Sequence, residues 1–324
     1  MYGSCGRTSH GQRNRYYVPV KVVIGGGSGF LGRALSEHLV GRQHQVVILT
    51  RGESVPASTG ARPVSWQPDG SPNPGAWARE IDGADAIVNL AGAGMADRRW
   101  TQRRKEELRL SRAQPARSLV AAVRAASARP GTFIQGSAVG FYGAHGDEVI
   151  DESFPPGQDF LGQLAVAWEA EAHPAAALGC RLVILRSGVV LGRGGGMLKK
   201  VIPPFQFFVG GPIASGRQYL SWIHLADWVA LVTWAIETSS VSGVVNATSP
   251  GPATNADFSR ALGRALRRPS WLRVPGFALR ILFGEMASDM LIAGQRVVPK
   301  RALEAGFTFK HPDVDPALSQ LIRT

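Results

Sequence analysis

The fold of this chain is decided near its start by the stretch Val20-Lys21-Val22-Val23-Ile24-Gly25-Gly26-Gly27-Ser28-Gly29-Phe30-Leu31-Gly32. β-Favouring residues run into a glycine cluster, and residues 33–39 then open a helical pattern. A strand, a glycine turn and a helix are the arrangement that binds a dinucleotide. We expect Gly26 to permit the tight turn, Gly29 to let the pyrophosphate approach the backbone, and Gly32 to let the helix pack closely. The first glycine gap is one residue longer than usual, and Phe30 and Leu31 lie inside this predicted cofactor segment.

The type of nucleotide is indicated by the next apolar run, residues 44–51, which predicts a second buried strand. An acidic side chain at the end of this strand would bind the ribose hydroxyls of NAD, whereas a basic one accommodates a 2′-phosphate. Here the strand ends in Thr50 and Arg51, and Glu53 lies beyond the turn glycine. The guanidinium of Arg51 can form a charge-assisted pair with a phosphate, so the sequence favours NADP(H).

Further buried strands are predicted within residues 85–92, 132–143, 181–192 and 244–247, and residues 52–75 read as a connection rich in proline and glycine. Strands that alternate with helical patterns predict an α/β fold with a doubly wound parallel sheet of the Rossmann type. Such sheets bind ligands at the carboxyl ends of their strands. The small residues that end the third strand therefore extend the predicted cofactor site to Leu90, Ala91 and Gly92.

The composition of the 324 residues, 44% hydrophobic and 19% charged, is that of a globular protein. The two cysteines, Cys5 and Cys180, form no metal or disulfide motif, and no apolar run is long enough to span a bilayer. We therefore expect a cytoplasmic protein with no metal and no membrane partner. The net charge of +12 includes a basic cluster that we interpret as a solvated helix face rather than a nucleic-acid site: Arg98, Arg99, Arg103, Arg104, Lys105, Arg109 and Arg112.

The predicted domain organisation has three parts. Residues 1–17 are polar and basic and predict a disordered extension. Residues 18–250 form the nucleotide-binding domain, with part of 193–217 contributing to the substrate region. Residues 251–324 are rich in helical patterns, with Thr254 or Asn255 as a helix cap, and predict a smaller lid over the ligand crevice.

Several motifs together resemble an extended short-chain dehydrogenase/reductase, namely residues 25–32, 85–92, 136–143 and 222–227. More narrowly, the chain is similar to an atypical epimerase-family branch, some of whose members are labelled cell-division-inhibitor-like. The motifs of that branch are Trp168-Glu169, residues 186–192, residues 210–213 and residues 294–299. The resemblance covers residue 20 to the C-terminus and implies a bound NADP(H), a C-terminal domain of unknown function, and Arg186 among the cofactor-binding residues.

The chain departs from the superfamily at its catalytic pair, Tyr-x-x-x-Lys. The two corresponding positions hold Leu161 and Ala165, neither of which can transfer a proton. Ser137, at the predicted carboxyl end of a strand, is then the candidate to hold a substrate oxygen. Tyr142 is the nearest candidate proton donor, with packing as its alternative role.

Residues 222–227 lead into a helix and contribute Trp222 and His224 to the predicted substrate region. The histidine could donate a proton because its ordinary pKa lies near neutrality. Asp227 can equally be a helix cap, and a structural role is the interpretation that the sequence favours for both His224 and Asp227.

Three functions remain open on the sequence. The leading interpretation is an NADP(H)-dependent oxidoreductase of a small carbonyl or alcohol substrate, monomeric or homodimeric. A non-catalytic NADP(H)-binding regulator is the alternative from another class, because it would need no proton-transfer pair. A nucleotide-sugar epimerase is disfavoured by Arg51 and by the missing pair.

Overall fold

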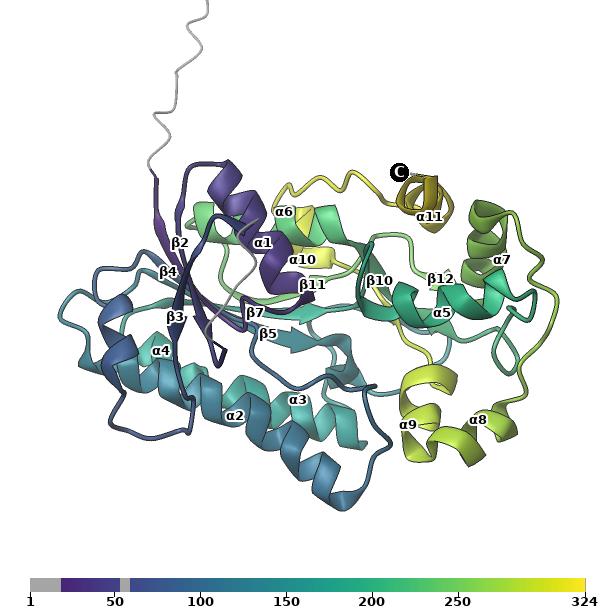
Figure 1. The fold of residues 1–324 in the computed structure, drawn as a ribbon, viewed down its shortest axis with the longest axis horizontal. Coiled ribbons are helices and arrows are strands. Elements are labelled where there is room, and N and C mark those ends of the chain that lie inside the picture. The colour runs from purple at the N-terminus through teal and green to yellow at the C-terminus, as the bar shows by residue number, and fades with distance from the viewer. Residues whose placement is uncertain (1–18, 53–58, 324) are drawn as a thin grey trace, which may run out of the picture.

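The computed structural model describes residues 19–52 and 59–323, so the predicted extension at 1–17 and Glu53 lie outside the described residues. Its centre is a seven-stranded parallel sheet in the order β11-β7-β5-β4-β1-β2-β3 (Figure 1). The strands are β1 (Lys21–Gly25), β2 (Gln45–Thr50), β3 (Arg62–Ser65), β4 (Ala86–Asn89), β5 (Thr132–Ala138), β7 (Arg181–Ser187) and β11 (Gly243–Ala247). The predicted doubly wound α/β fold is confirmed.

Helices cover both faces of this sheet (Figure 1). One face carries α1 (Phe30–Gly41), α6 (Leu225–Glu237) and α10 (Lys300–Glu304), and the other carries α2 (Gln102–Ala125), α3 (Phe160–Ala170), α4 (His173–Ala177) and the short η2 (Ala76–Glu80). Successive strand residues point to opposite faces, so Ile24 packs in one apolar core and Val23 in the other. A sheet buried on both faces explains the continuous apolar runs of its strands.

Strand β3 was not predicted, because its residues belong to the connection rich in proline and glycine. It pairs only with β2 and forms the edge of the sheet. Pro63 is tolerated there because an edge strand needs hydrogen bonds on one side alone.

The chain beyond the sheet forms a smaller, mostly helical part. A third apolar core lies among α5 (Gly196–Gln206), α7 (Asn255–Leu266) and α11 (Val314–Arg323). Short strand pairs connect it to the sheet: β8 (Val189–Leu191) with β10 (Trp222–His224), and β9 (Tyr219–Leu220) with β12 (Ala253–Thr254). The remaining elements are η3 (Val139–Tyr142), β6 (Val149–Ile150), α8 (Gly276–Phe283), α9 (Glu285–Ala287), η4 (Ser288–Ile292) and β13 (Arg296–Val297).

The C-terminal part does not stand apart from the sheet and the helices that cover it. Ala302 and Phe309 are buried in the same core as β1 and α1, and β13 pairs with β6. Thr254 caps α7, as one of the two predicted alternatives, by accepting a hydrogen bond from the amide of Asp257.

Asp227 was expected to cap α6, and that expectation is wrong. Nδ1 of His224 is the capping acceptor, at 3.1 Å from the amide of Ala226. The carboxylate of Asp227 instead accepts the amides of Lys310 and His311, at 3.0 and 2.8 Å. It thereby ties the C-terminal tail to the main core.

We predict that Phe309→Ala lowers the free energy of unfolding of the whole chain by about 3 kcal/mol, because the ring is only 9% exposed. Chemical denaturation followed by circular dichroism measures the change. The control is Leu303→Ala, a side chain that is 46% exposed, which should change the stability by less than about 0.5 kcal/mol. An unchanged main transition in Phe309→Ala would contradict a core shared by both parts of the chain.

Candidate functional site

A cleft of about 550 Å³ lies at the carboxyl ends of four neighbouring strands, β4, β1, β2 and β3. Most of its walls are the ends of these strands and the segments that follow them, and helix α2 adds Ser111, Gln114 and Pro115. The lining residues include Gly26, Ser28, Gly29, Thr50, Arg51, Trp66, Gln67, Asp69, Leu90, Ala91, Gly92 and Ala93. The chain order reverses between β1 and β4, and such a switch point is where open α/β sheets bind ligands.

The glycine turn after β1 forms the floor of this cleft. Gly26 has φ of +78°, and a side chain there would place its Cβ 2.8 Å from the backbone nitrogen of Ala91. A Cβ at Gly32 would lie 2.4 Å from the Cα of Gly27, so helix α1 can approach the turn only with glycine at this position. The roles expected of these two glycines in the turn and in helix packing therefore match the geometry.

The N-terminus of α1 opens on the cleft. Its N-cap, Gly29, lines the cleft and provides no capping side chain, and the first turn holds no acidic residue. A Cβ at Gly29 would have a single close neighbour, the carbonyl oxygen of Gly26 at 3.3 Å. This end of the helix suits an anion, because its amides and its dipole both favour negative charge.

Arg51 lies directly after the last residue of β2, at the position from which the sequence predicts the type of nucleotide. Its side chain is exposed, lines the cleft and forms no ion pair with any residue of the described ranges. The acidic residue among the cleft-lining positions, Asp69, follows β3 instead, and its carboxylate accepts the amide of Ser71. The described end of β2 therefore offers a cation rather than a carboxylate.

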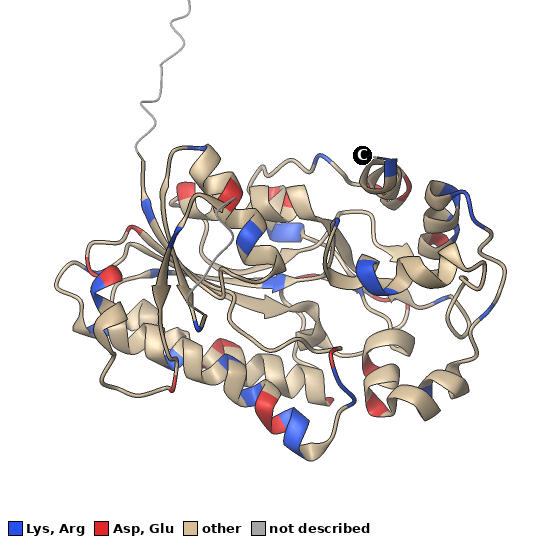
Figure 2. Cartoon of the chain, in the orientation of Figure 1, with Lys and Arg blue, Asp and Glu red and all other residues tan. Residues whose placement is uncertain are grey.

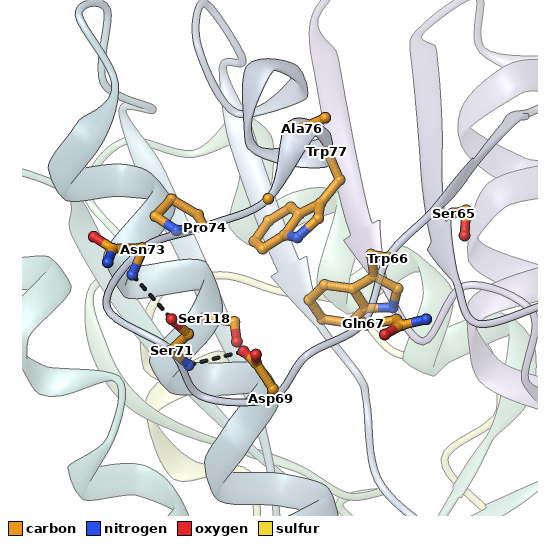
Figure 3. A pocket seen from close by; sticks show the side chains of 11 residues that line it. Ser65, Trp66, Gln67, Asp69, Ser71, Asn73, Pro74, Ala76, Trp77 and Ser118 are labelled. Atoms are coloured by element: carbon orange, nitrogen blue, oxygen red, sulfur yellow. Dashed lines mark hydrogen bonds between the residues drawn. The ribbon is translucent and has the colours of Figure 1, made fainter.

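A second pocket, of about 350 Å³, adjoins the cleft and shares Trp66, Gln67 and Asp69 with it (Figure 3). The rings of Trp66 and Trp77 meet edge to face on one side, with centroids 5.3 Å apart. On the other side, the turn at Asp69 is held by its bond to Ser71 (Figure 3). The two tryptophans and this turn fix the outer wall of the cleft.

Arg112 supports the wall after β4, a role that the sequence did not indicate. It was assigned to a solvated basic face, but it is only 8% exposed, so that assignment is wrong for this residue. Its guanidinium donates to the carbonyl of Ala93 at 3.1 Å and stacks over Trp168 at 5.1 Å. Burial lowers the pKa of Arg112 to about 10, so it stays charged at neutral pH.

The rest of the basic cluster is largely paired. Arg103 and Arg104 lie within 3.5 and 3.1 Å of Glu107, and Lys105 binds Glu285 at 2.6 Å. The last pair connects α2 to α9. These contacts lower the free positive charge that the cluster can offer to a ligand.

Ser137, Tyr142 and Arg186 come together in one buried network, and none of them is among the residues that line the cleft. The carboxylate of Glu169 binds Arg186 through two hydrogen bonds of 2.8 Å and accepts the hydroxyl proton of Ser137 at 2.6 Å. Tyr142 accepts from Arg186 at 3.1 Å and donates to Oδ1 of Asn246 at 2.7 Å. These five residues are at most 5% exposed.

Electrostatics in this network favour fixed protonation states. Burial lowers the pKa of Arg186, but its hydrogen bonds and charge interaction with Glu169 outweigh burial and raise the pKa above its ordinary value. Burial raises the pKa of Tyr142 by more than Arg186 lowers it, so the phenol keeps its proton at neutral pH. A phenol that acts as a general acid or base needs the opposite shift.

Glu169 escaped prediction as a site residue, although a signal was present. Leu161, Ala165 and Glu169 are four residues apart and so share one face of α3. Leu161 packs against Gly140, because a Cβ added to that glycine would lie 3.2 Å from the Cβ of Leu161. Ala165 packs in an apolar cluster with Tyr142. A carboxylate on such a buried face requires a cationic partner.

His224 and Trp222 hold the C-terminal part in place. Nε2 of His224 donates to Oε1 of Gln320 at 3.0 Å, because Nδ1 already accepts the amide of Ala226. Burial, followed by the charge of His311 stacked at 3.9 Å, lowers the pKa of His224. Trp222 is fully buried and donates to the carbonyl of Gly251 at 2.9 Å.

Phe30 and Leu31 do not line the cleft. A Cβ at Gly195 would lie 2.3 Å from the ring of Phe30, so this ring packs against the loop before α5. Leu31 packs against the main core. Contact of either residue with a cofactor stays a prediction.

Known proteins resemble the chain along most of its length. Residues 22–247 match the model of the NAD dependent epimerase/dehydratase family, and residues 274–321 match a domain of unknown function, DUF1731. An epimerase family protein of Mycobacterium bovis is 43% identical over 298 residues, which cover 92% of this chain and 96% of that protein.

Solved structures agree with this similarity. The human epimerase family protein SDR39U1 with NADPH superposes with a TM-score of 0.85 at 34% identity, covering 94% of this chain and 99% of that one. A nucleoside-diphosphate sugar epimerase from Corynebacterium glutamicum has a TM-score of 0.76 at 32% identity, covering 94% of this chain and 59% of that one.

We predict that Glu169→Gln lowers the free energy of unfolding by about 3–5 kcal/mol, because it leaves the charge of Arg186 buried without a counter-ion. Denaturant titration checks the value. The matched control is Asp315→Asn, which removes an exposed ion pair with Arg264 and should change the stability by less than about 1 kcal/mol. An equal loss of unfolding free energy in both variants would show that the buried ion pair contributes no more to stability than the exposed one.

Proposed function

The chain belongs to the NAD dependent epimerase/dehydratase family, and on that premise we propose that it binds NADP(H) and exchanges hydride with a small carbonyl or alcohol substrate. The observation that carries the nucleotide assignment is Arg51, an exposed cation at the end of β2 and in the wall of the cleft. The cytoplasmic location expected from the sequence is kept as part of this proposal.

The residues of the cleft fit such a cofactor. The first amides of α1 and the backbone at Gly29 would hold the pyrophosphate, and Arg51 would hold the 2′-phosphate through charge-assisted hydrogen bonds. The volume of about 550 Å³ lies within the range of known ligand pockets, about 300–1,000 Å³. The NADPH bound by the human relative supports the same choice of nucleotide. When bound, the cofactor supplies the hydride.

The chain's own residues would bind and orient rather than move protons. The single hydroxyl proton of Ser137 is donated to Glu169, and that of Tyr142 is donated to Asn246. Ser137 can therefore offer only its lone pairs to a substrate hydroxyl. We propose that water supplies or accepts the proton, because Leu161 and Ala165 replace the usual donor pair.

A non-catalytic NADP(H)-binding regulator is the second candidate, and one specific observation favours it. Both candidate catalytic hydroxyls lie in the buried network, with Tyr142 fully buried. This candidate would also accommodate the cell-division-inhibitor-like branch that the sequence motifs resemble. Sugar epimerisation finds less support, since the positions of Leu161 and Ala165 offer no base.

Substitution of Arg51 by aspartate is expected to weaken NADPH binding by about ten- to a hundredfold and to leave NADH binding within about threefold, because a charge-assisted bond contributes about 1.5–3 kcal/mol. Fluorescence titration with each nucleotide measures both affinities. Arg103→Asp, a 92% exposed side chain on α2, controls for the change in net charge. Wild-type protein that binds both nucleotides equally would refute the assignment.

The hydride step is tested with NADPH carrying deuterium at C4 and a panel of small aldehydes and ketones. Oxidation of NADPH with deuterium in the product alcohol is the expected result. In the reverse reaction, oxidation of the product alcohol by NADP+, Ser137→Ala should then lower the turnover number by more than tenfold and leave nucleotide affinity unchanged, because the lone pairs of Ser137 can accept a hydrogen bond from the substrate hydroxyl. Tight NADPH binding without any transfer across the panel would favour the regulator.

A further inference from the structure

Large apolar side chains are exposed on two segments of the C-terminal part. The most exposed are Phe207 at 77%, Trp271 at 73%, Ile281 at 72%, Phe277 at 67% and Leu282 at 63%. Phe208, Val209 and Leu272 are exposed by between 41% and 55%. An isolated exposed side chain needs no explanation, but a group of large ones indicates an interaction surface.

The two segments lie side by side. The amide of Val274 bonds to the carbonyl of Pro212, and the amide of Ala214 bonds to the carbonyl of Val274, both at 2.9 Å. The guanidinium of Arg268 stacks on Phe208 at 4.8 Å. Helix α8 continues from this junction, since a Cβ at Gly276 would lie 3.2 Å from the Cβ of Ala214.

Helix α8 contributes only its last residue, Phe283, to a core of the described chain, where it packs beside Met286. None of its residues is buried, whereas Met286 and Ala287 of the following α9 are. Met286 packs with Trp100 and Phe160, so α9 attaches this region to α2 and α3. Phe277, Arg280 and Ile281 share one face of α8, which this attachment leaves uncovered.

The unpaired charges on this surface are positive. Residues 258–284 contain no aspartate or glutamate, and neither do residues 172–226. Four exposed arginines interrupt the apolar residues, and none forms an ion pair with a described residue: Arg267, Arg268, Arg273 and Arg280. The acidic residues that flank the first stretch, Asp257 and Glu285, are paired with Arg260 and Lys105. The connection from α7 to α8 accordingly shows blue segments along the outer edge (Figure 2).

We propose that this apolar–basic face, formed by residues 207–209 and 267–282, docks on the surface of an anionic lipid bilayer. Exposed aromatic and aliphatic side chains among arginines are the composition of interfacial membrane segments: the apolar groups enter the headgroup boundary and the cations meet the lipid charge. This differs from the expectation of no membrane partner, which rested on the absence of a spanning segment. No helix within the described ranges can cross a membrane, and docking requires none.

Other occupants fit the observations less well. A two-fold interface between copies would set the same patch against itself and bring like charges together. Nucleic acid would match the arginines and aromatic rings but would give Ile281, Leu282 and Leu272 no apolar partner.

The experiment is co-sedimentation of the full-length protein with vesicles of phosphatidylcholine alone or mixed equally with phosphatidylglycerol. We expect binding to the anionic vesicles, weakened by salt, and little binding to the neutral ones. Arg273→Gln with Arg280→Gln should weaken anionic binding about thirtyfold, at about fivefold for each arginine. Phe277→Ser with Ile281→Ser should weaken it by at least tenfold.

Matched controls are Arg103→Gln with Arg124→Gln, and Leu110→Ser with Leu303→Ser, which change exposed residues on other elements. The controls should bind like wild type, and all variants should keep the wild-type NADPH affinity and melting temperature. Equal binding to both vesicles, no binding to either, or equal loss in the controls would overturn the proposal. So would a dimer in solution that Phe277→Ser with Ile281→Ser dissociates, because the face would then belong to a second copy.

Discussion

The buried ion pair between Glu169 and Arg186 is the interaction on which much of the structure depends. An isolated charge in an apolar interior is strongly unfavourable, so each group is stable there only because the other is present. Glu169 belongs to α3 and Arg186 to β7, and Ser137 adds the neighbouring β5. Through Tyr142 and Asn246 the network continues to β11, whose Asn246 also donates to the carbonyl of Val298 in the tail. The hydrogen bonds around this one ion pair thereby link the sheet, helix α3 and the C-terminal part.

The ion pair also bears on two properties that the wider superfamily combines, namely binding of a nucleotide and transfer of protons. The cleft at β1, β2 and β4 keeps the glycine turn and the cation that suit a nucleotide. The polar groups near the carboxyl end of β5 are instead used to satisfy each other, which leaves them little freedom to exchange protons. A polar network that is fully satisfied makes its members rigid. The proposed binding of a nucleotide and the proposed chemistry on it would therefore place different demands on this chain, and the network of Glu169 and Arg186 is suited to a structural role.

The sequence predicted those features that depend on neighbouring residues along the chain. Gly26 and Gly32 follow from the strand–turn–helix order, and Arg51 follows from its place at the end of a strand. Features that depend on distant partners were missed. Pro63 hid the edge strand β3, because a local pattern does not tell which strand lies at an edge. Arg112 belongs to a basic cluster along the chain, but it is buried through its contacts with Ala93 and Trp168. Asp227 accepts hydrogen bonds from amides more than eighty residues away. Glu169 required its partner Arg186 to be placed beside it.

The return of residues 300–309 to the main core has a consequence for biosynthesis. Ala302 and Phe309 cover strands, among them β1, that leave the ribosome well before residues 300–309 do. At about 5–20 residues per second, this apolar surface stays partly uncovered until residues 300–309 have also been made. A nascent chain, or one truncated by a premature stop, would present that uncovered surface to chaperones and proteases. Synthesis through residue 309 is therefore a condition for covering this core.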